Sequence, residues 1–189
     1  MIVVDDGSTD NTFESVKSKF TDPRIKIYRK GNTGASASRN FGVSVANGKY
    51  ICFLDSDDAF TENKLSIIYK YKQALDSGCV LYSKILLVSQ LVERIKPARG
   101  IEDGEDIFDY LFLSEGFVPT PSIVLAKELA ERVSWNENMS YGDDTDYSVR
   151  LYMAGCKLKM IDEVLVVCDD GEDNNRLSLS RLSLLKVLV

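Results

Sequence analysis

The chain has 189 residues, of which 44% are hydrophobic and 28% charged, and its formal net charge is −6. The apolar content argues against a disordered chain, and the negative balance argues against a general nucleic-acid-binding protein, which needs clustered Lys and Arg. Because the chain has no histidine, a Ser-His-Asp triad and a histidine-based zinc site are excluded, and acid–base chemistry must come from carboxylates, Lys, Tyr or Cys.

Residues 1–48 show the patterns of two strand–helix units. The segment "MIVVDD" predicts a short buried strand, and Asn11 with Glu14 predicts a capped helix through about Phe20. The segment "RIKIYR" alternates like a strand. The segment "GNTGASASRNFGVSVANG" then predicts a helix of small residues that Gly48 closes.

The same alternation continues through residue 118. "KYICFLD" predicts a second buried strand, "TENKLSIIYKYKQALDSG" an amphipathic helix that ends at Gly78, and "CVLYSKILLVSQLVERI" one or two strands. "EDGEDIFDYLFLSEG" has a helical pattern. This succession predicts an α/β fold with a mainly parallel, Rossmann-like sheet flanked by helices, in which ligands bind at the carboxyl ends of strands.

The second half of the chain is less regular. "PSIVLAKELAERV" predicts a strand that enters a helix, "TDYSVRLYMAG" a helix, and "KLKMIDEVLVVC" a strand pair or one bent strand. The tail "RLSLSRLSLLKVLV" predicts an amphipathic helix. We expect residues 1–189 to form a single domain with two halves, 1–118 and 119–189.

Neither a membrane span nor a secretion signal is evident in the sequence. No stretch reaches the roughly 18 uninterrupted apolar residues of a span, and no signal-peptide pattern opens the chain. We therefore expect a cytoplasmic protein. The cysteines lack CxxC spacing, which favours buried reduced thiols over disulfides or a zinc site. They are Cys52, Cys79, Cys156 and Cys168.

Carboxylates follow two of the predicted strands directly. Asp5 and Asp6 end the first strand, and Asp55 and Asp57 lie at the carboxyl end of the strand predicted from "KYICFLD", so both pairs should share one edge of the sheet. Carboxylates two residues apart can converge on a divalent cation, although an Asp-rich turn explains them equally well. A phosphatase with an aspartyl nucleophile also begins with this pattern.

Three further side chains have both a functional and a structural interpretation. Arg39, near a predicted helix start, can reach a phosphate or a base, or be a surface arginine. Asp143 and Asp144 can cap a helix through its dipole, or supply a general base at a cleft. Trp135, in the loop before them, can stack on an acceptor sugar or pack in the core.

Three segments, taken in order, resemble the motifs of family 2 glycosyltransferases, which are inverting enzymes with the GT-A fold. They are "IVVDDGSTDNT", "GNTGASASRNFGVSVANGKYICFLDSDD" and "GDDTDYSVRLYMAG". The resemblance covers nearly the whole chain and implies a nucleotide-sugar-binding half, 1–118, and an acceptor-binding half, 119–189. It implies transfer from a nucleoside-diphosphate sugar, UDP-sugars first, to a hydroxyl of a glycan, lipid-linked or surface-polysaccharide acceptor. The processive Q-x-x-R-W segment is absent, which favours single additions.

The resemblance also implies roles for the donor-side residues. Asp6, with Asp5 beside it, matches the carboxylates that bind the nucleotide base. Arg39 matches an arginine that lies against the nucleotide. Asp57 would ligate Mn²⁺ or Mg²⁺ at the diphosphate, and Asp55 would support the ribose or complete the metal's coordination shell.

On the acceptor side, the family usually has Glu-Asp where this chain has Asp143 and Asp144. Asp144 therefore matches the catalytic base, and Asp143 matches its partner with a shorter side chain. The base would remove a proton from the acceptor hydroxyl, which attacks the sugar from the opposite face.

One departure from the family pattern motivates an alternative. Met1 stands directly before the strand "IVVDD", where the family has an earlier strand, so a hydrophobic sheet edge would be exposed. The alternative is a truncated, catalytically weak GT-A domain that acts as a binding or assembly module. A phosphatase is disfavoured because Ala59 stands where its motif has Thr or Val, and a nucleotidyltransferase because no Gly-rich phosphate loop is present. The sequence leaves a homo-oligomer and a peripheral membrane contact through the tail open.

Overall fold

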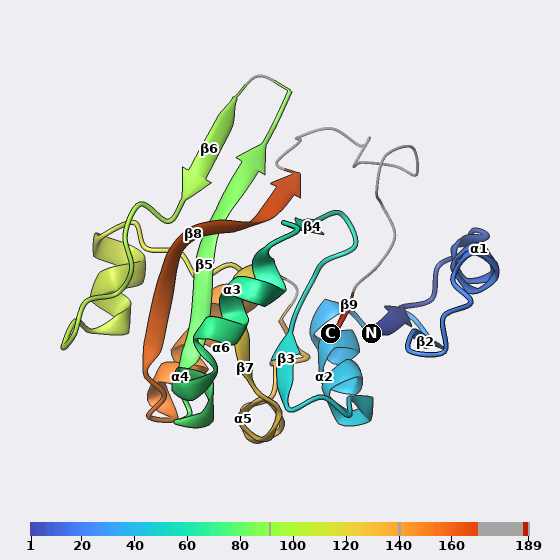
Figure 1. The fold of residues 1–189 in the computed structure, drawn as a ribbon, viewed down its shortest axis with the longest axis horizontal. Helices are drawn as coiled ribbons and strands as arrows, with labels where there is room; N and C mark the ends of the chain where they lie inside the picture. Colours follow the sequence, from blue (N-terminus) through green and yellow to red (C-terminus); the bar gives the residue numbers. More distant parts are fainter. Residues whose placement is uncertain (91, 140, 170–186, 189) are drawn as a thin grey trace.

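The structure of the protein, a computed structural model, describes residues 1–90, 92–139, 141–169 and 187–188. The strands are β1 (Ile2–Asp5), β2 (Lys26–Arg29), β3 (Tyr50–Cys52), β4 (Ala59–Phe60), β5 (Val80–Val88), β6 (Glu93–Lys96), β7 (Val124–Ala126), β8 (Leu158–Asp169) and β9 (Val187–Leu188). The helices are α1 (Thr12–Lys19), α2 (Ala35–Val45), α3 (Lys64–Lys70), α4 (Lys72–Asp76), α5 (Lys127–Arg132), α6 (Asp143–Met153), the π-helical η1 (Asp109–Leu113) and the 3₁₀-helical η2 (Thr120–Ser122) (Figure 1).

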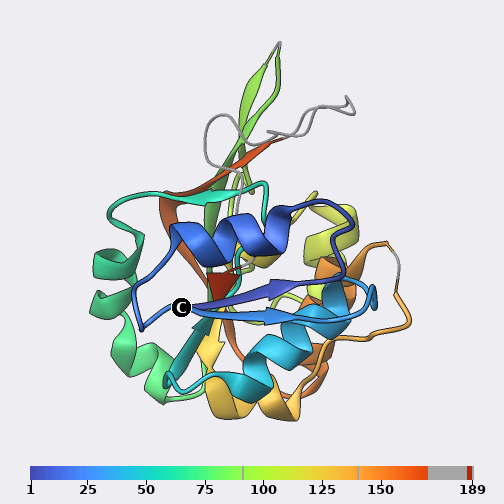
Figure 2. The same cartoon turned by 90° about the vertical axis from the view of Figure 1, so that its right-hand side faces the viewer.

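The strands form two sheets flanked by helices, as expected of an α/β fold. The larger has the order β3-β7-β5-β8-β4, with β6 paired to β5, and the smaller has the order β2-β1-β9. Figure 2 shows α1 and α2 on opposite sides of the β1–β2 pair. Helices α3 and α4 connect β3 to β5.

Strand direction differs from the mainly parallel sheet that we expected. Among the described pairings, two of seven are parallel, β1 with β2 and β5 with β8. Strand β7 is antiparallel to both β3 and β5, so β3 and β5 themselves run in the same direction, as a strand–helix–strand unit requires. The sheet is mixed because β7, β4 and β6 pair with this framework in the antiparallel direction.

Most predicted elements are present, with two local differences. Asn11 stands at the start of α1 without a side-chain hydrogen bond, and Asp10 Oδ1 instead accepts from the Thr12 amide at 3.0 Å. The helix predicted to end at Gly78 is divided into α3 and α4 at Tyr71, whose amide bonds to the carbonyl three residues back, at Ile68. The last segment, "KLKMIDEVLVVC", forms one bent strand, β8, with a register shift against β5.

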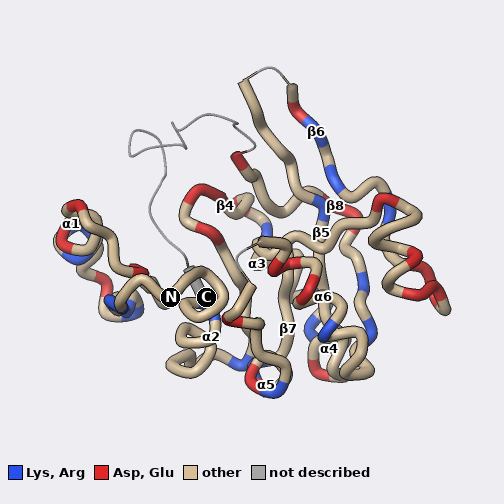
Figure 3. Tube along the Cα trace, turned by 180° about the vertical axis from the view of Figure 1, so that it is seen from behind, with Lys and Arg blue, Asp and Glu red and all other residues tan. Residues whose placement is uncertain are grey.

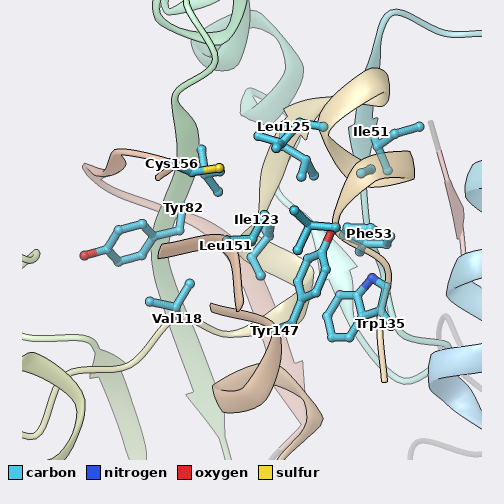
Figure 4. Close-up of a cluster of buried hydrophobic side chains, with 14 of the residues drawn as sticks. Ile51, Phe53, Tyr82, Val118, Ile123, Leu125, Trp135, Tyr147, Leu151 and Cys156 are labelled. Carbon is cyan, nitrogen blue, oxygen red and sulfur yellow. The ribbon is translucent and has the colours of Figure 1, made fainter. Parts of the chain in front are cut away.

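One core cluster lies between the large sheet and the helices α2, α5 and α6, and a second lies between the sheet and α3 and α4. In the first, Phe53 and Tyr147 are at most 1% exposed, and Trp135 packs against both of their rings (Figure 4). All four cysteines are buried free thiols, as the sequence predicted. Within the described residues, no helix has the length and apolar character of a membrane span.

The side of β1 that faces away from β2 pairs with β9, in the register Ile2 with Leu188 and Val3 with Val187. This pairing covers Ile2 and Val3 of the sheet edge that the sequence suggested would be exposed. Residues 187–188 therefore form a strand, which corrects the helix predicted for them. The remainder of that predicted helix, and with it the proposed membrane contact of the tail, lies outside the described residues.

A fully buried lysine joins α3 to η2. Lys64 Nζ donates to the Pro121 carbonyl at 2.6 Å and lies 3.8 Å from the centroid of the Phe60 ring. Burial disfavours the charged ammonium and lowers the pKa of Lys64 to about 8. The side chain fixes the position of η2 beside the loop that leads into β4.

We expect this lysine to make stability rise with pH relative to a Lys64→Met variant. Between pH 8 and the ordinary lysine pKa of 10.5, the unfolded chain holds the proton that the folded chain has lost. The unfolded state therefore binds more protons, and the free energy of unfolding increases as pH rises through this window. Urea denaturation of both proteins at about pH 7, 9 and 10 checks this, and equal pH dependence in the two would contradict it.

Candidate active site

Asp5 closes the turn after β1. Its Oδ1 accepts from the Ser8 amide at 3.2 Å and from the Ser8 hydroxyl, and its Oδ2 lies 3.4 Å from Arg29 Nε on β2. The turn needs glycine at position 7, because φ is 81° there. The Cβ of any other residue at this position would lie 2.8 Å from the backbone nitrogen of Asn32. The carboxylate of Asp5 therefore binds groups of the same chain, Ser8 and Arg29.

Asp6 anchors the beginning of α2. Its Oδ1 accepts from the amide and the hydroxyl of Thr33, each at 3.0 Å, and its Oδ2 accepts from the Gly34 amide at 2.7 Å. Burial opposes ionisation of Asp6, but the bonds from Thr33 and Gly34 outweigh it and lower the pKa. The predicted base-binding residue thus fixes the helix on which Arg39 lies.

Arg39 joins carboxylates from both halves of the chain. Its Nη2 donates to Asp55 Oδ1 at 2.8 Å and Oδ2 at 3.2 Å, and its Nη1 donates to Asp143. The Arg39 side chain is 10% exposed, against 23% for Asp55 and 28% for Asp143. Burial lowers the pKa of Arg39, but the two carboxylates outweigh it and raise the pKa.

This triad brings three sequence-predicted residues together in one place. Asp55 follows β3, Arg39 lies one turn inside α2, and Asp143 is the first residue of α6. Both terminal nitrogens of the guanidinium are bound to carboxylates. The nucleotide contact predicted for Arg39 stays a prediction.

Trp135 lies beneath the triad and is 2% exposed. It is stacked against Tyr147, with ring centroids 3.8 Å apart, and the Arg39 guanidinium lies 4.6 Å from its ring centroid. A buried ring does not offer a face to an acceptor sugar, so the packing interpretation of Trp135 is the one that holds. No pattern in the sequence predicted its contact with Arg39.

Asp57 and Asp58 complete the acidic loop before β4, which is red in Figure 3. The carboxylate of Asp57 is partly exposed and makes no hydrogen bond or ion pair with the rest of the described chain. Burial, followed by repulsion from Asp55 and Asp57, raises the pKa of Asp58 to about 7. The loop thus holds three carboxylates, of which only Asp55 pairs with a cation among the described residues.

The carboxylates of this loop fit a divalent cation bound with its substrate. Among the residues that the structure describes, no three His, Cys, Asp or Glu side chains are arranged to hold a metal by themselves. Magnesium and manganese commonly bind through one or two carboxylates, and substrate phosphates and water complete the shell. Asp57, with Asp55 beside it, matches that requirement.

Asp144 follows Asp143 at the start of α6, which Gly142 opens in the left-handed conformation with a φ of 71°. Its Oδ1 accepts from the Thr145 amide at 2.8 Å. Burial, followed by repulsion from Asp143, raises the pKa of Asp144, and Arg39 lowers it only in part. A carboxylate with a raised pKa is a stronger base than an ordinary aspartate, which suits proton removal from a hydroxyl.

Comparisons with known proteins find glycosyltransferases similar to this chain. Amylovoran biosynthesis glycosyltransferase AmsB of Erwinia amylovora is 30% identical over 174 residues, which cover 87% of this chain and 58% of that protein. Glycosyltransferase GlyG of Streptococcus pneumoniae is 28% identical over 182 residues, which cover 87% of this chain and 59% of that protein. The chain thus spans less than two thirds of the length of these relatives.

Solved structures show the same fold. TarS of S. aureus in complex with UDP-GlcNAc superposes with a TM-score of 0.67 at 19% identity, over 95% of this chain and 52% of that chain. The mannosyltransferase PcManGT from Pyrobaculum calidifontis, in complex with GDP-Man and Mn²⁺, superposes with a TM-score of 0.62 at 17% identity. The match covers 92% of this chain and 48% of that chain. The predicted GT-A fold is confirmed.

The family model for glycosyl transferase family 2 matches residues 1–122 of the 189, which include the turn after β1, helix α2 and the acidic loop. The match covers more than half of the chain and takes in the donor-side residues predicted from the motifs. The chain therefore belongs to glycosyl transferase family 2.

Proposed function

We propose that this domain transfers one sugar at a time, with inversion, from a nucleoside-diphosphate sugar to an acceptor hydroxyl. The observation that carries the proposal is the triad in which Arg39 holds Asp55 beside Asp143. The triad places the acidic loop, which carries Asp57, next to Asp143. Asp143 directly precedes Asp144, the proposed base. Family membership removes the reasons for a phosphatase or a nucleotidyltransferase.

The donor side would be formed by the ends of β1 and β3. The solved relatives with UDP-GlcNAc and with GDP-Man and Mn²⁺ support a nucleotide-sugar donor, with UDP-sugars as the first candidates. Asp5 and Asp6 would shape the base pocket through the turn that they hold. When bound at Asp57 and Asp55, Mn²⁺ or Mg²⁺ would act as a Lewis acid on the leaving diphosphate.

The acceptor side would be formed by the start of α6. Asp144 would take the proton of the acceptor hydroxyl, since its pKa is raised by burial and by Asp143. Asp143, paired with Arg39, would fix the start of α6, on which Asp144 lies.

The proposed acceptor class rests on a relative, and the proposed cellular location rests on the composition of the chain. The amylovoran biosynthesis relative supports a surface-polysaccharide or lipid-linked glycan acceptor. The four free cysteine thiols support a cytoplasmic location. Because the net charge of the chain is negative, we expect no nucleic-acid partner.

Calorimetric titration of UDP, GDP and dTDP, with and without Mn²⁺, tests the donor site. We expect binding to at least one nucleotide that requires the metal and that Asp57→Ala weakens by at least about tenfold, because the cation loses its protein ligand. Asp103→Ala makes the same change at an exposed carboxylate paired with Lys157 and should leave binding unchanged. No binding to any nucleotide would contradict the proposal and support the binding or assembly module instead.

A further inference from the structure

The Arg39 guanidinium rests on a ring that the proposed mechanism does not use. Its Cζ atom lies 4.6 Å from the centroid of the Trp135 ring, close enough for a cation–π contact. The same ring stacks on Tyr147 of α6, with centroids 3.8 Å and planes 14° apart. Figure 4 shows Trp135 and Tyr147 side by side, near Phe53, which precedes Asp55 in the chain.

The backbone of Trp135 is held by the residue next to Arg39. The Trp135 amide donates to Asn40 Oδ1 at 2.8 Å, and Asn40 Nδ2 donates to the Trp135 carbonyl at 3.0 Å. Asn40 Nδ2 also donates to Glu137 Oε1 at 2.8 Å. Helix α2 therefore contacts Trp135, in the opposite half of the chain, at two points. Asn40 bonds to the backbone of Trp135, and Arg39 packs on its ring.

The ion pairs alone do not define the orientation of the guanidinium. They engage Nη1 and Nη2, while Nε, although buried, has no hydrogen-bond partner among the described residues. A planar group held at two atoms can still tilt about the line that joins them. A flat aromatic face packed against it removes that freedom, because tilting would break the contact.

We propose that Trp135 is a positioning residue, which fixes the plane of Arg39 and through it the spacing between Asp55 and Asp143. Asp55 belongs to the donor side and Asp143 adjoins the proposed base, so one ring sets the relation between the two sides. The effect on ligand binding rests on the proposed function. The effect on Arg39 itself does not.

Side-chain NMR of arginine tests the placement directly, with Arg39→Lys used to assign the signals. We expect separate, slowly exchanging Nη resonances for Arg39 in the wild type and in Trp135→Phe, which keeps an aromatic face. In Trp135→Leu the two Nη resonances should exchange with each other faster, because a guanidinium that can tilt is bound less firmly by Asp55 and Asp143. An exchange rate in Trp135→Leu equal to that of the wild type would overturn the inference.

Calorimetry with UDP and Mn²⁺ tests the consequence. Trp135→Leu should weaken binding about fivefold, and Trp135→Phe should change it less than about twofold, in line with the loss or retention of a buried cation–π contact. Tyr110→Leu is the matched control, since Tyr110 is also a buried aromatic ring but packs against Tyr82 and Arg99. Equal weakening in Trp135→Leu and Tyr110→Leu would mean general loosening and overturn the positioning role.

The two experiments separate the two proposals. A wild type that binds no nucleotide contradicts the proposed function, and the Arg39 resonances still decide whether Trp135 positions the guanidinium. A wild type that binds UDP, with Trp135→Leu identical to it in both measurements, leaves the function standing and overturns the inference.

Discussion

Replacing Asp144 with Asn is expected to lower the rate of sugar transfer by about 10³-fold, the range typical for loss of a general base. The amide has nearly the same shape as the carboxylate and can still accept from the Thr145 amide, but it cannot take a proton from the acceptor hydroxyl. Binding of UDP with Mn²⁺ should be retained, because Asp144 lies on the acceptor side. Release of UDP during transfer to an acceptor glycan, measured at saturating donor, checks the rate.

The control for this variant is Asp146→Asn, which makes the same substitution in the first turn of the same helix. Asp146 lies 3.8 Å from Arg150 Nε, and it takes no part in the triad. We expect its transfer rate to stay within about threefold of the wild type, as for substitutions away from the reacting groups. A comparable loss in both variants would point to disruption of α6 and would remove Asp144 from the role of base.

Replacing Arg39 with Ala is expected to have the largest effect on stability, a loss of about 3 kcal/mol in the free energy of unfolding. Removing one partner of a buried ion pair leaves uncompensated charge, and here two carboxylates, Asp55 and Asp143, lose their cation together. The same change also removes the cation over Trp135. Because Trp135 is the chain's one tryptophan, urea denaturation followed by its fluorescence reports on this site directly.

Two further variants sharpen that measurement. Arg39→Lys keeps one positive charge but cannot bind two carboxylates with a planar fork, so we expect an intermediate loss. Arg24→Ala removes an exposed arginine paired with Asp22 and should cost less than about 1 kcal/mol, as surface ion pairs do. If Arg39→Ala and Arg24→Ala were equally stable, the triad would not stabilise the fold.

The sequence predicted the elements that depend on local pattern. The buried strands β1 and β3, the small-residue helix α2 and the helix α6 follow from runs of apolar residues, from glycine positions and from acidic helix starts. The motifs also identified Arg39, Asp55 and Asp143, which the structure brings together. That these three bind one another was not predicted.

What escaped prediction depends on contacts between distant segments. Trp135 and Asn40 are 95 positions apart, and the bonds between them depend on how α2 packs against the loop before α6. No periodicity in either segment indicates that contact. The antiparallel strands of the large sheet were missed for the same reason, since β7 finds its neighbours through the tertiary fold and its three residues carry little pattern.

The position of β7 has a consequence for synthesis of the chain. It lies between β3 and β5, although it leaves the ribosome after both. Until residue 126 has emerged, Ile51 and Leu81 lack the strand that pairs with them, and their edges are open to other nascent chains. A pause in translation before that point would therefore prolong the interval in which these two edges are open.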